Sequence, residues 1–198
     1  MDLKRKSNME IRSYSGEFAT PKTNGRQISG YAVVFNQQSE ILYDAVNNRM
    51  FKEIIDPKAI TPELLKRSDV KAVLEHSAER LLARYKNGTG TLSLRVDTRG
   101  LFYYFEAPRT ADGDFALEMI KRGDITGSSF KFTATPKDCT WTKQENGIWL
   151  RRVNKISGLY DVSIVSDPAY SETSVTVEGM AKRDDRWKVE LELLRRKI

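Results

Sequence analysis

Short runs in which apolar and polar residues alternate recur along most of this chain, and such runs are typical of β-strands. Two of them, Met9 to Phe18 and Ile28 to Phe35, are separated by Pro21-Lys22-Thr23-Asn24-Gly25. Because an Asn-Gly pair readily adopts the positive φ angles of a tight turn, we expect these two runs to form a hairpin. Further strands are predicted at Val70 to Leu74, Leu92 to Val96, Leu101 to Ala107, Ser128 to Thr135, Trp149 to Val153 and Tyr160 to Val165.

Helical signals occupy less of the body of the chain. Thr61-Pro62 predicts a short helix that ends at Arg67, since threonine can cap a helix and proline is tolerated in its first turn. Between Asp112 and Arg122 the pattern also predicts a helix, with acidic residues first, basic residues last and a glycine after them. This balance predicts an α+β fold, mainly β, in which helices flank a closed or nearly closed antiparallel β-barrel.

The C-terminal stretch has a different pattern. Past Gly179, apolar residues recur at helical spacing with charged residues between them, at Trp187, Leu191, Leu194 and Ile198. We therefore predict a folded domain over residues 1–179 and an amphipathic helical tail over residues 180–198. Such a tail can pack on the core of its own domain or bind another protein. Binding to a surface of acidic lipids is the third alternative.

The composition narrows the class of protein. A chain of 198 residues with 39% hydrophobic residues can bury the core of one domain. The net charge of +6 identifies no partner, and no motif indicates specific nucleic-acid binding. One cysteine, Cys139, and one histidine allow neither an intramolecular disulfide nor an ordinary zinc site, so we expect no metal and no cofactor. Since no apolar run approaches the ~20 residues of a membrane span, we expect a soluble, intracellular protein without membrane contact.

The single histidine, His76, is the most informative residue for chemistry. It follows the apolar run Lys71-Ala72-Val73-Leu74-Glu75, and it is the one side chain that titrates near neutral pH without perturbation. A serine nucleophile in this chain would therefore have to use His76 as its base. Taken alone, a histidine at the end of a strand is more often structural or solvated than catalytic.

Two adjacent serines are candidates for the nucleophile. Gly127-Ser128-Ser129-Phe130 lies at a predicted loop-to-strand transition, where a hydroxyl can be presented at the end of a strand. Neighbouring side chains of a strand point to opposite faces, so we expect at most one of Ser128 and Ser129 to face the histidine. Cys139 is a weak rival, because nothing beside it in the sequence would depress its pKa.

A carboxylate is needed to hold and polarise the base. We prefer Asp161, which begins the strand Asp161-Val162-Ser163-Ile164-Val165, to Asp167. Asp167 precedes Pro168, and aspartate is common in that turn-forming context for purely local reasons.

Six segments form an ordered series: Gly30 to Asn36, the strand that ends in His76, Gly88 to Leu92, Arg122 to Asp124, Gly127 to Phe132 and Asp161 to Tyr170. In this order they resemble the HK97-type prohead protease family of tailed bacteriophages, over roughly Met9 to Val177. Such proteases are similar to herpesvirus assemblins, serine proteases with a β-barrel surrounded by helices, whose third catalytic member is a second histidine.

The resemblance implies roles for individual residues. His76 matches the base and Ser129 the nucleophile, and Asp161 would replace the second histidine of the assemblins. The turn after Asp161 lies where assemblins place oxyanion donors; Pro168 has no N–H, which leaves Ala169 or Tyr170. Lys131 departs from the family pattern, which usually has glycine there, so that a long cation either lines the substrate cleft or projects away from it.

The resemblance also implies a function. We expect a serine endopeptidase that acts inside the assembling prohead in the cytoplasm of the bacterial host. Its partners would be the major capsid protein, whose scaffolding segment it removes, and itself, through self-cleavage; assemblins are dimers, so a homodimer is a further expectation. The tail over residues 181–198 would then direct the enzyme to the scaffold. The alternative is a non-catalytic protein that organises capsid assembly.

Overall fold

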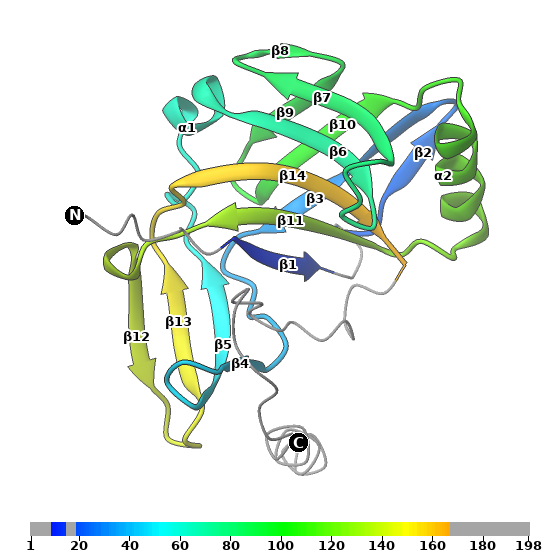
Figure 1. Ribbon diagram of the computed structural model, residues 1–198. Coiled ribbons are helices and arrows are strands. Elements are labelled where there is room, and N and C mark those ends of the chain that lie inside the picture. Colours follow the sequence, from blue (N-terminus) through cyan, green and yellow to red (C-terminus); the bar gives the residue numbers. More distant parts are fainter. Residues whose placement is uncertain (1–8, 15–18, 167–198) are drawn as a thin grey trace.

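The strands of this protein form three sheets, of six, four and four strands (Figure 1). The structure is a computed structural model, and it describes residues 9–14 and 19–166. The six-stranded sheet, called the site sheet below, has the order β1(Glu10–Tyr14), β11(Gly127–Thr133), β14(Gly158–Val165), β6(Asp69–Leu74), β7(Leu81–Lys86) and β8(Thr89–Gly90). The second sheet has the order β2(Lys22–Asn24), β3(Gln27–Val34), β10(Gly100–Glu106) and β9(Leu92–Val96). The third has the order β12(Cys139–Lys143), β13(Trp149–Val153), β5(Arg49–Ile55) and β4(Leu42–Asp44).

The hydrophobic core lies between the site sheet and the second sheet. Its largest fully buried side chains come from both: Phe130 and Phe132 on β11, Tyr103 and Phe105 on β10, and Leu74 on β6. The rings of Phe130 and Phe132 stack with their centroids 4.6 Å apart. Because one face of the site sheet is committed to this core, side chains at alternate positions are free to build a polar site on the other face.

Two α-helices and one 3-10 turn accompany the sheets in the described residues. α1(Pro62–Arg67) begins after Thr61, whose hydroxyl accepts a hydrogen bond from the Leu64 N–H at 3.2 Å. α2(Ala111–Arg122) begins after Thr110 and ends at Gly123, which has the left-handed φ of 80°. The 3-10 turn η1 spans Pro136–Asp138. Both predicted helices are thus present, the second starting one residue before the predicted Asp112. No helix in the described ranges is long and apolar enough to cross a membrane.

The mainly β prediction is confirmed, the predicted hairpin is wrong, and the predicted barrel is not confirmed. The predicted hairpin joins β2 to β3, whereas β1 pairs antiparallel with β11 in the site sheet. The Asn24-Gly25 turn does reverse the chain, yet the run that it pairs with β3 is the three-residue strand just before it. The sheets do not close into a barrel either, since the outermost strands of the site sheet, β1 and β8, have no pairing with one another. The predicted C-terminal helix lies outside the described residues.

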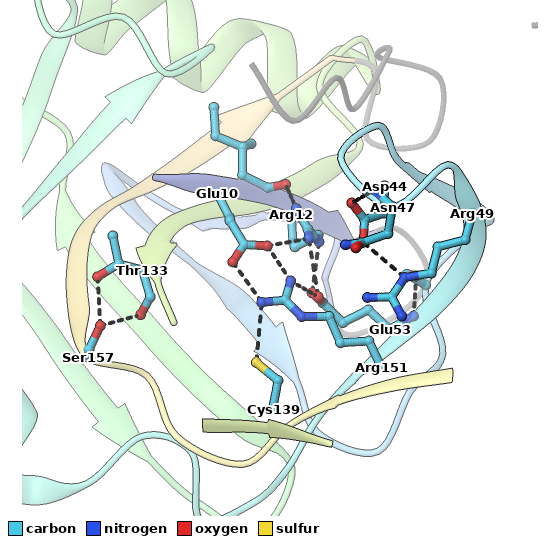
Figure 2. Close-up of polar contacts among 12 residues, drawn as sticks. Glu10, Arg12, Asp44, Asn47, Arg49, Glu53, Thr133, Cys139, Arg151 and Ser157 are labelled. Carbon is cyan, nitrogen blue, oxygen red and sulfur yellow. Dashed lines mark hydrogen bonds and ion pairs between the residues drawn. The ribbon is translucent and has the colours of Figure 1, made fainter. Parts of the chain in front are cut away.

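A buried ionic cluster joins the site sheet to the third sheet (Figure 2). It consists of Glu10 and Arg12 on β1, Glu53 on β5 and Arg151 on β13, and each of these side chains is at most 9% exposed. Arg12 Nε lies 2.8 Å from Glu53 Oε1, and Arg12 Nη2 lies 2.7 Å from Glu10 Oε2. Arg151 reaches both carboxylates, at 2.7 Å to Glu53 Oε2 and 2.8 Å to Glu10 Oε1. The cluster therefore fixes β1 to two strands of the third sheet.

The ion pairs of the cluster favour the charged forms of Glu10 and Arg12. Burial by itself would raise the pKa of Glu10, but the hydrogen bond from Arg151 and the charges of Arg12 and Arg151 outweigh it and hold the pKa below its usual 4.5. The charges of Glu53 and Glu10 likewise keep the pKa of Arg12 raised despite its burial. Both shifts stabilise ion pairs whose side chains are at most 9% exposed.

Glu53→Gln should lower the free energy of unfolding by about 3–5 kcal/mol, because it leaves two buried guanidinium groups with one carboxylate. Glu53 is 2% exposed, so water cannot replace the lost partner. Urea denaturation followed by circular dichroism measures the change. The matched control is Glu118→Gln on the exposed surface of α2, which should shift the free energy by no more than about 0.5 kcal/mol. Equal effects of the two substitutions would contradict an energetic role for the cluster.

Candidate active site

A tight turn at the end of β6 presents the imidazole of His76. The Ser77 N–H donates to the Leu74 carbonyl at 2.9 Å, and the two central residues, Glu75 and His76, have φ angles of 49° and 53°. Both angles fall in the left-handed region, which costs a residue other than glycine about 1–2 kcal/mol. Two consecutive residues held in this conformation indicate that the surrounding structure imposes the turn.

The strand β14 supplies the contacts that impose it. The His76 N–H donates to Ser163 Oγ at 2.9 Å, and the Glu75 N–H donates to the Ile164 carbonyl at 3.2 Å. The Glu75 carboxylate accepts in turn from the Ser166 N–H at 2.7 Å. These bonds satisfy the backbone of the turn and offset its conformational cost, so the position of the imidazole is set by the strand that also carries Asp161.

Ser129 lies on β11 and Asp161 on β14, and these two strands are neighbours in the site sheet. Strand pairing places Ser129 opposite Ser163 and Lys131 opposite Asp161, so the side chains of all four share one face of the site sheet. Ser129 is fully buried, and the side chain of Asp161 is 9% exposed.

The three predicted site residues form one chain of hydrogen bonds. His76 Nδ1 lies 2.7 Å from Asp161 Oδ1, and His76 Nε2 lies 2.6 Å from Ser129 Oγ. An ionised carboxylate only accepts, so Nδ1 carries the proton and Nε2 is left with the lone pair that faces the serine hydroxyl. An imidazole held in this tautomer can remove the proton of Ser129, and the carboxylate stabilises the imidazolium that results.

Ser128 points into the opposite side of the sheet, toward the core. Its hydroxyl donates to the Ala19 carbonyl at 2.5 Å and lies 2.8 Å from the hydroxyl of Tyr103. Tyr103 is buried, and burial raises its pKa, so it remains a neutral hydroxyl. Gly30 makes room for this pair, since a Cβ there would come within 2.8 Å of the Tyr103 oxygen. The structure therefore brings Ser129, and not Ser128, to His76.

Lys131 does not project away from the site. Its Nζ lies 3.2 Å from Asp161 Oδ2, the carboxylate oxygen that does not face the histidine. The side chain is 25% exposed, so this ion pair is partly screened by solvent. Asp161 thus has a partner for each oxygen, and both contacts restrict the rotation of its carboxylate.

Three residues that were not predicted from the sequence also contact the site. Ser163 binds the backbone of His76, while the Ser13 hydroxyl and the Arg12 carbonyl both contact Ser129 Oγ. Ser163 could have been found, because it lies two residues after Asp161 in a strand and so shares its face. Ser13 and Arg12 gave no such signal, since their place beside β11 depends on strand pairing across more than a hundred residues.

The remaining candidates lie elsewhere. Ala169 and Tyr170, the predicted oxyanion donors, fall outside the described residues, as does Asp167. Cys139 lies beside the ionic cluster, where its sulfur accepts a hydrogen bond from Arg151 at 3.3 Å and burial raises its pKa; it has no contact with His76. Within the described part of the chain no group of three or more histidine, cysteine, aspartate or glutamate side chains is placed to hold a metal ion.

Comparison with known proteins gives one family and one fold. A family model described as the caudovirus prohead serine protease matches residues 9–185. Among solved structures, the capsid assembly protease of bacteriophage T4 is similar, with a TM-score of 0.52 and 14% sequence identity. The alignment covers 83% of this chain and 100% of that one, and at this identity it supports the fold alone. No curated protein sequence matches this chain.

Proposed function

Because this chain belongs to the family of caudovirus prohead serine proteases, we propose that His76, Ser129 and Asp161 are its catalytic triad. The observation that carries the proposal is the unbroken chain of two short hydrogen bonds from Ser129 Oγ through the imidazole to Asp161. The left-handed turn at His76 supports it, since a strained conformation is retained where its geometry is needed.

The geometry suits acyl transfer through a covalent intermediate. Ser129 Oγ attacks the carbonyl carbon of the scissile peptide bond while its proton passes to His76 Nε2. The imidazolium then gives this proton to the leaving nitrogen as the C–N bond breaks, which leaves an acyl ester on Ser129. Water attacks the ester with His76 again as the base, and the returning proton restores the Ser129 hydroxyl.

Asp161 has two roles in this reaction. Its Oδ1 holds the Nδ1 proton, which keeps the lone pair of Nε2 directed at the serine. Its negative charge stabilises the imidazolium while the reaction is under way. The positive charge of Lys131 weakens the stabilisation of the imidazolium by Asp161. The same ion pair helps to hold the Nδ1 proton, because it fixes the carboxylate of Asp161 in place. We propose that Lys131 orients Asp161 beside the substrate cleft.

We further propose that the substrates are the scaffolding segment of the major capsid protein and this chain itself, inside the assembling prohead. The family supports this assignment, and confinement in a closed shell would raise the local concentration of substrate enough to replace tight binding. The helical tail over residues 180–198 as a targeting segment and the homodimer remain predictions.

Co-expression with the major capsid protein of the same virus tests the proposed function. The wild-type chain should shorten the capsid protein at its scaffolding segment and also shorten itself, both seen by intact mass. A His76→Ala variant of the protease should leave both chains at full length, because His76 is the one side chain within hydrogen-bond distance of Ser129 Oγ that titrates near neutral pH without perturbation. Full-length chains with the wild type would favour the non-catalytic assembly protein, and trimming with His76→Ala would identify another protease as the cause.

A further inference from the structure

The hydroxyl of Ser129 has more partners than a triad serine requires. Its oxygen lies 2.6 Å from His76 Nε2, but also 2.9 Å from the Arg12 carbonyl and 3.1 Å from the Ser13 hydroxyl. A hydroxyl has one proton to donate and two lone pairs with which to accept. The single proton of Ser129 therefore goes either to the imidazole or to the Arg12 carbonyl, while the Ser13 hydroxyl donates its own proton to a lone pair of Ser129 Oγ.

Both additional partners come from β1. Ser13 is the residue that pairs with Ser129 across the antiparallel ladder of β1 and β11, so their side chains share the face that carries His76 and Asp161. The neighbouring side chain, Arg12, points to the other face and enters the ionic cluster. Strand β1 thus contacts Ser129 through the backbone carbonyl of Arg12 and the side chain of Ser13. The side chain of Arg12 anchors the same strand in the ionic cluster.

We propose that Ser13 is a positioning residue for the nucleophile, and that the ionic cluster holds its strand in the register that this requires. The inference rests on the proposed function of Ser129. Donation from Ser13 occupies one lone pair of Ser129 Oγ and thereby restricts where the serine proton and its reactive lone pair point.

The hydrogen bond from Ser13 to Ser129 Oγ strengthens as the proton of Ser129 departs. While the Ser129 O–H bond breaks and its proton moves to His76 Nε2, partial negative charge develops on Oγ, and it passes to the carbonyl oxygen of the substrate once the bond to the carbonyl carbon has formed. A hydrogen bond to a charged acceptor is roughly twice as strong as one to a neutral acceptor. The same donation assists the later step in which Ser129 Oγ leaves the acyl ester with its bonding electrons. Ser13 therefore stabilises the transition state more than the resting enzyme.

The anchoring of β1 gives this contact its precision. β1 is a five-residue strand at the edge of the site sheet, and among the strands that the structure describes it pairs with β11 alone. An edge strand of that length is free to shift against its partner unless something else holds it, and a shift of one residue would turn Ser13 to the opposite face. The ion pairs of Glu10 and Arg12 with Glu53 and Arg151 supply that restraint from the third sheet.

The rate at which diisopropyl fluorophosphate modifies Ser129 in the full chain tests the proposal without a known substrate. The wild type should form the adduct at Ser129, located by mass spectrometry of the peptide that contains it. Ser13→Ala should form it about five- to thirtyfold more slowly, the factor expected for one lost hydrogen bond of about 1–2 kcal/mol. Ser13→Thr keeps the hydroxyl and should react at close to the wild-type rate.

The matched control is Ser29→Ala on β3, a half-buried serine in a strand of the second sheet, which should react as the wild type does. Thermal unfolding of each variant excludes loss of the fold as the cause of a slower reaction. A Ser13→Ala variant that reacts as fast as the wild type, or a Ser13→Thr variant as slow as Ser13→Ala, overturns the role of Ser13. A wild type that is not modified at Ser129, or a Ser129→Ala variant that is still modified in this peptide, overturns the proposed function and this inference with it.

Discussion

Ser129→Ala should reduce the rate of peptide-bond cleavage by about 10⁴-fold or more, because it removes the oxygen that forms the acyl ester. The measurement is kcat/KM on a fluorogenic peptide that spans the cleavage site found by co-expression. The variant should still fold, since Ser129 lies on a strand that is paired on both sides, by β1 and β14, and a methyl group fits where its hydroxymethyl group was. Loss of the hydrogen bonds of its hydroxyl should lower the free energy of unfolding by no more than about 1–3 kcal/mol.

The neighbouring serine is a close control for this prediction. Ser128 is equally buried, but its hydroxyl is bonded to the Ala19 carbonyl and to Tyr103 in the core. Ser128→Ala should retain kcat/KM within about tenfold and should instead lower the free energy of unfolding by about 1–3 kcal/mol, because it leaves buried polar groups without a partner. The reverse pattern, with activity lost in Ser128→Ala and kept in Ser129→Ala, would assign the nucleophile to Ser128.

Asp161→Asn should lower kcat by about 10⁴-fold near neutral pH while the fold is retained. The asparagine amide nitrogen can donate to His76 Nδ1, and the imidazole proton then resides on Nε2. In that tautomer Nε2 has no lone pair for the proton of Ser129, although all heavy atoms remain in place. The substitution also removes the charge that stabilises the imidazolium, and it leaves Lys131 without its counter-ion.

Asp69→Asn is the matched control, because it is the same chemical substitution in the same sheet but away from His76 and Ser129. Asp69 begins β6 and is paired with Arg84 at the exposed end of the strand. Its amide should leave kcat unchanged within about twofold and stability within about 0.5 kcal/mol, as expected for an exposed ion pair. A drop in kcat of similar size for both variants, or an unaffected kcat in Asp161→Asn, would remove Asp161 from the triad.

The local elements of the fold could be predicted because they depend on near neighbours in the sequence. Thr61-Pro62 favours a helix start through local contacts, because threonine caps the helix and proline fits its first turn, and the prediction of a helix from Pro62 to Arg67 is confirmed. Strand β9, which was predicted at Leu92 to Val96, also has the predicted bounds. The strands β5 and β7 were missed, since Arg49–Ile55 and Leu81–Lys86 mix charged and apolar residues without strict alternation. Such strands are stabilised by their partners in the sheet more than by their own pattern.

The candidate site divides in the same way. The chemistry of the residues and their resemblance to a known family selected His76, Ser129 and Asp161, and the alternation of side chains along a strand implied that only one serine would face the histidine. The sequence could not choose that face by itself. Pairing of β11 with both β1 and β14 decided it, by turning Ser128 to the core and Ser129 to the polar side.

By itself, then, the sequence determined a mainly β protein, the two α-helices of its described part, a family, and three candidate residues for acyl transfer. Only the tertiary structure decided that the sheets stay open, that β1 lies beside the nucleophile, and that Glu10, Arg12, Glu53 and Arg151 meet in one buried cluster. The physical reason is the range of the interactions. Caps, turns and side-chain alternation act within a few residues, whereas strand order and buried charge pairs join residues that are dozens to more than a hundred positions apart, and no local pattern encodes those partners.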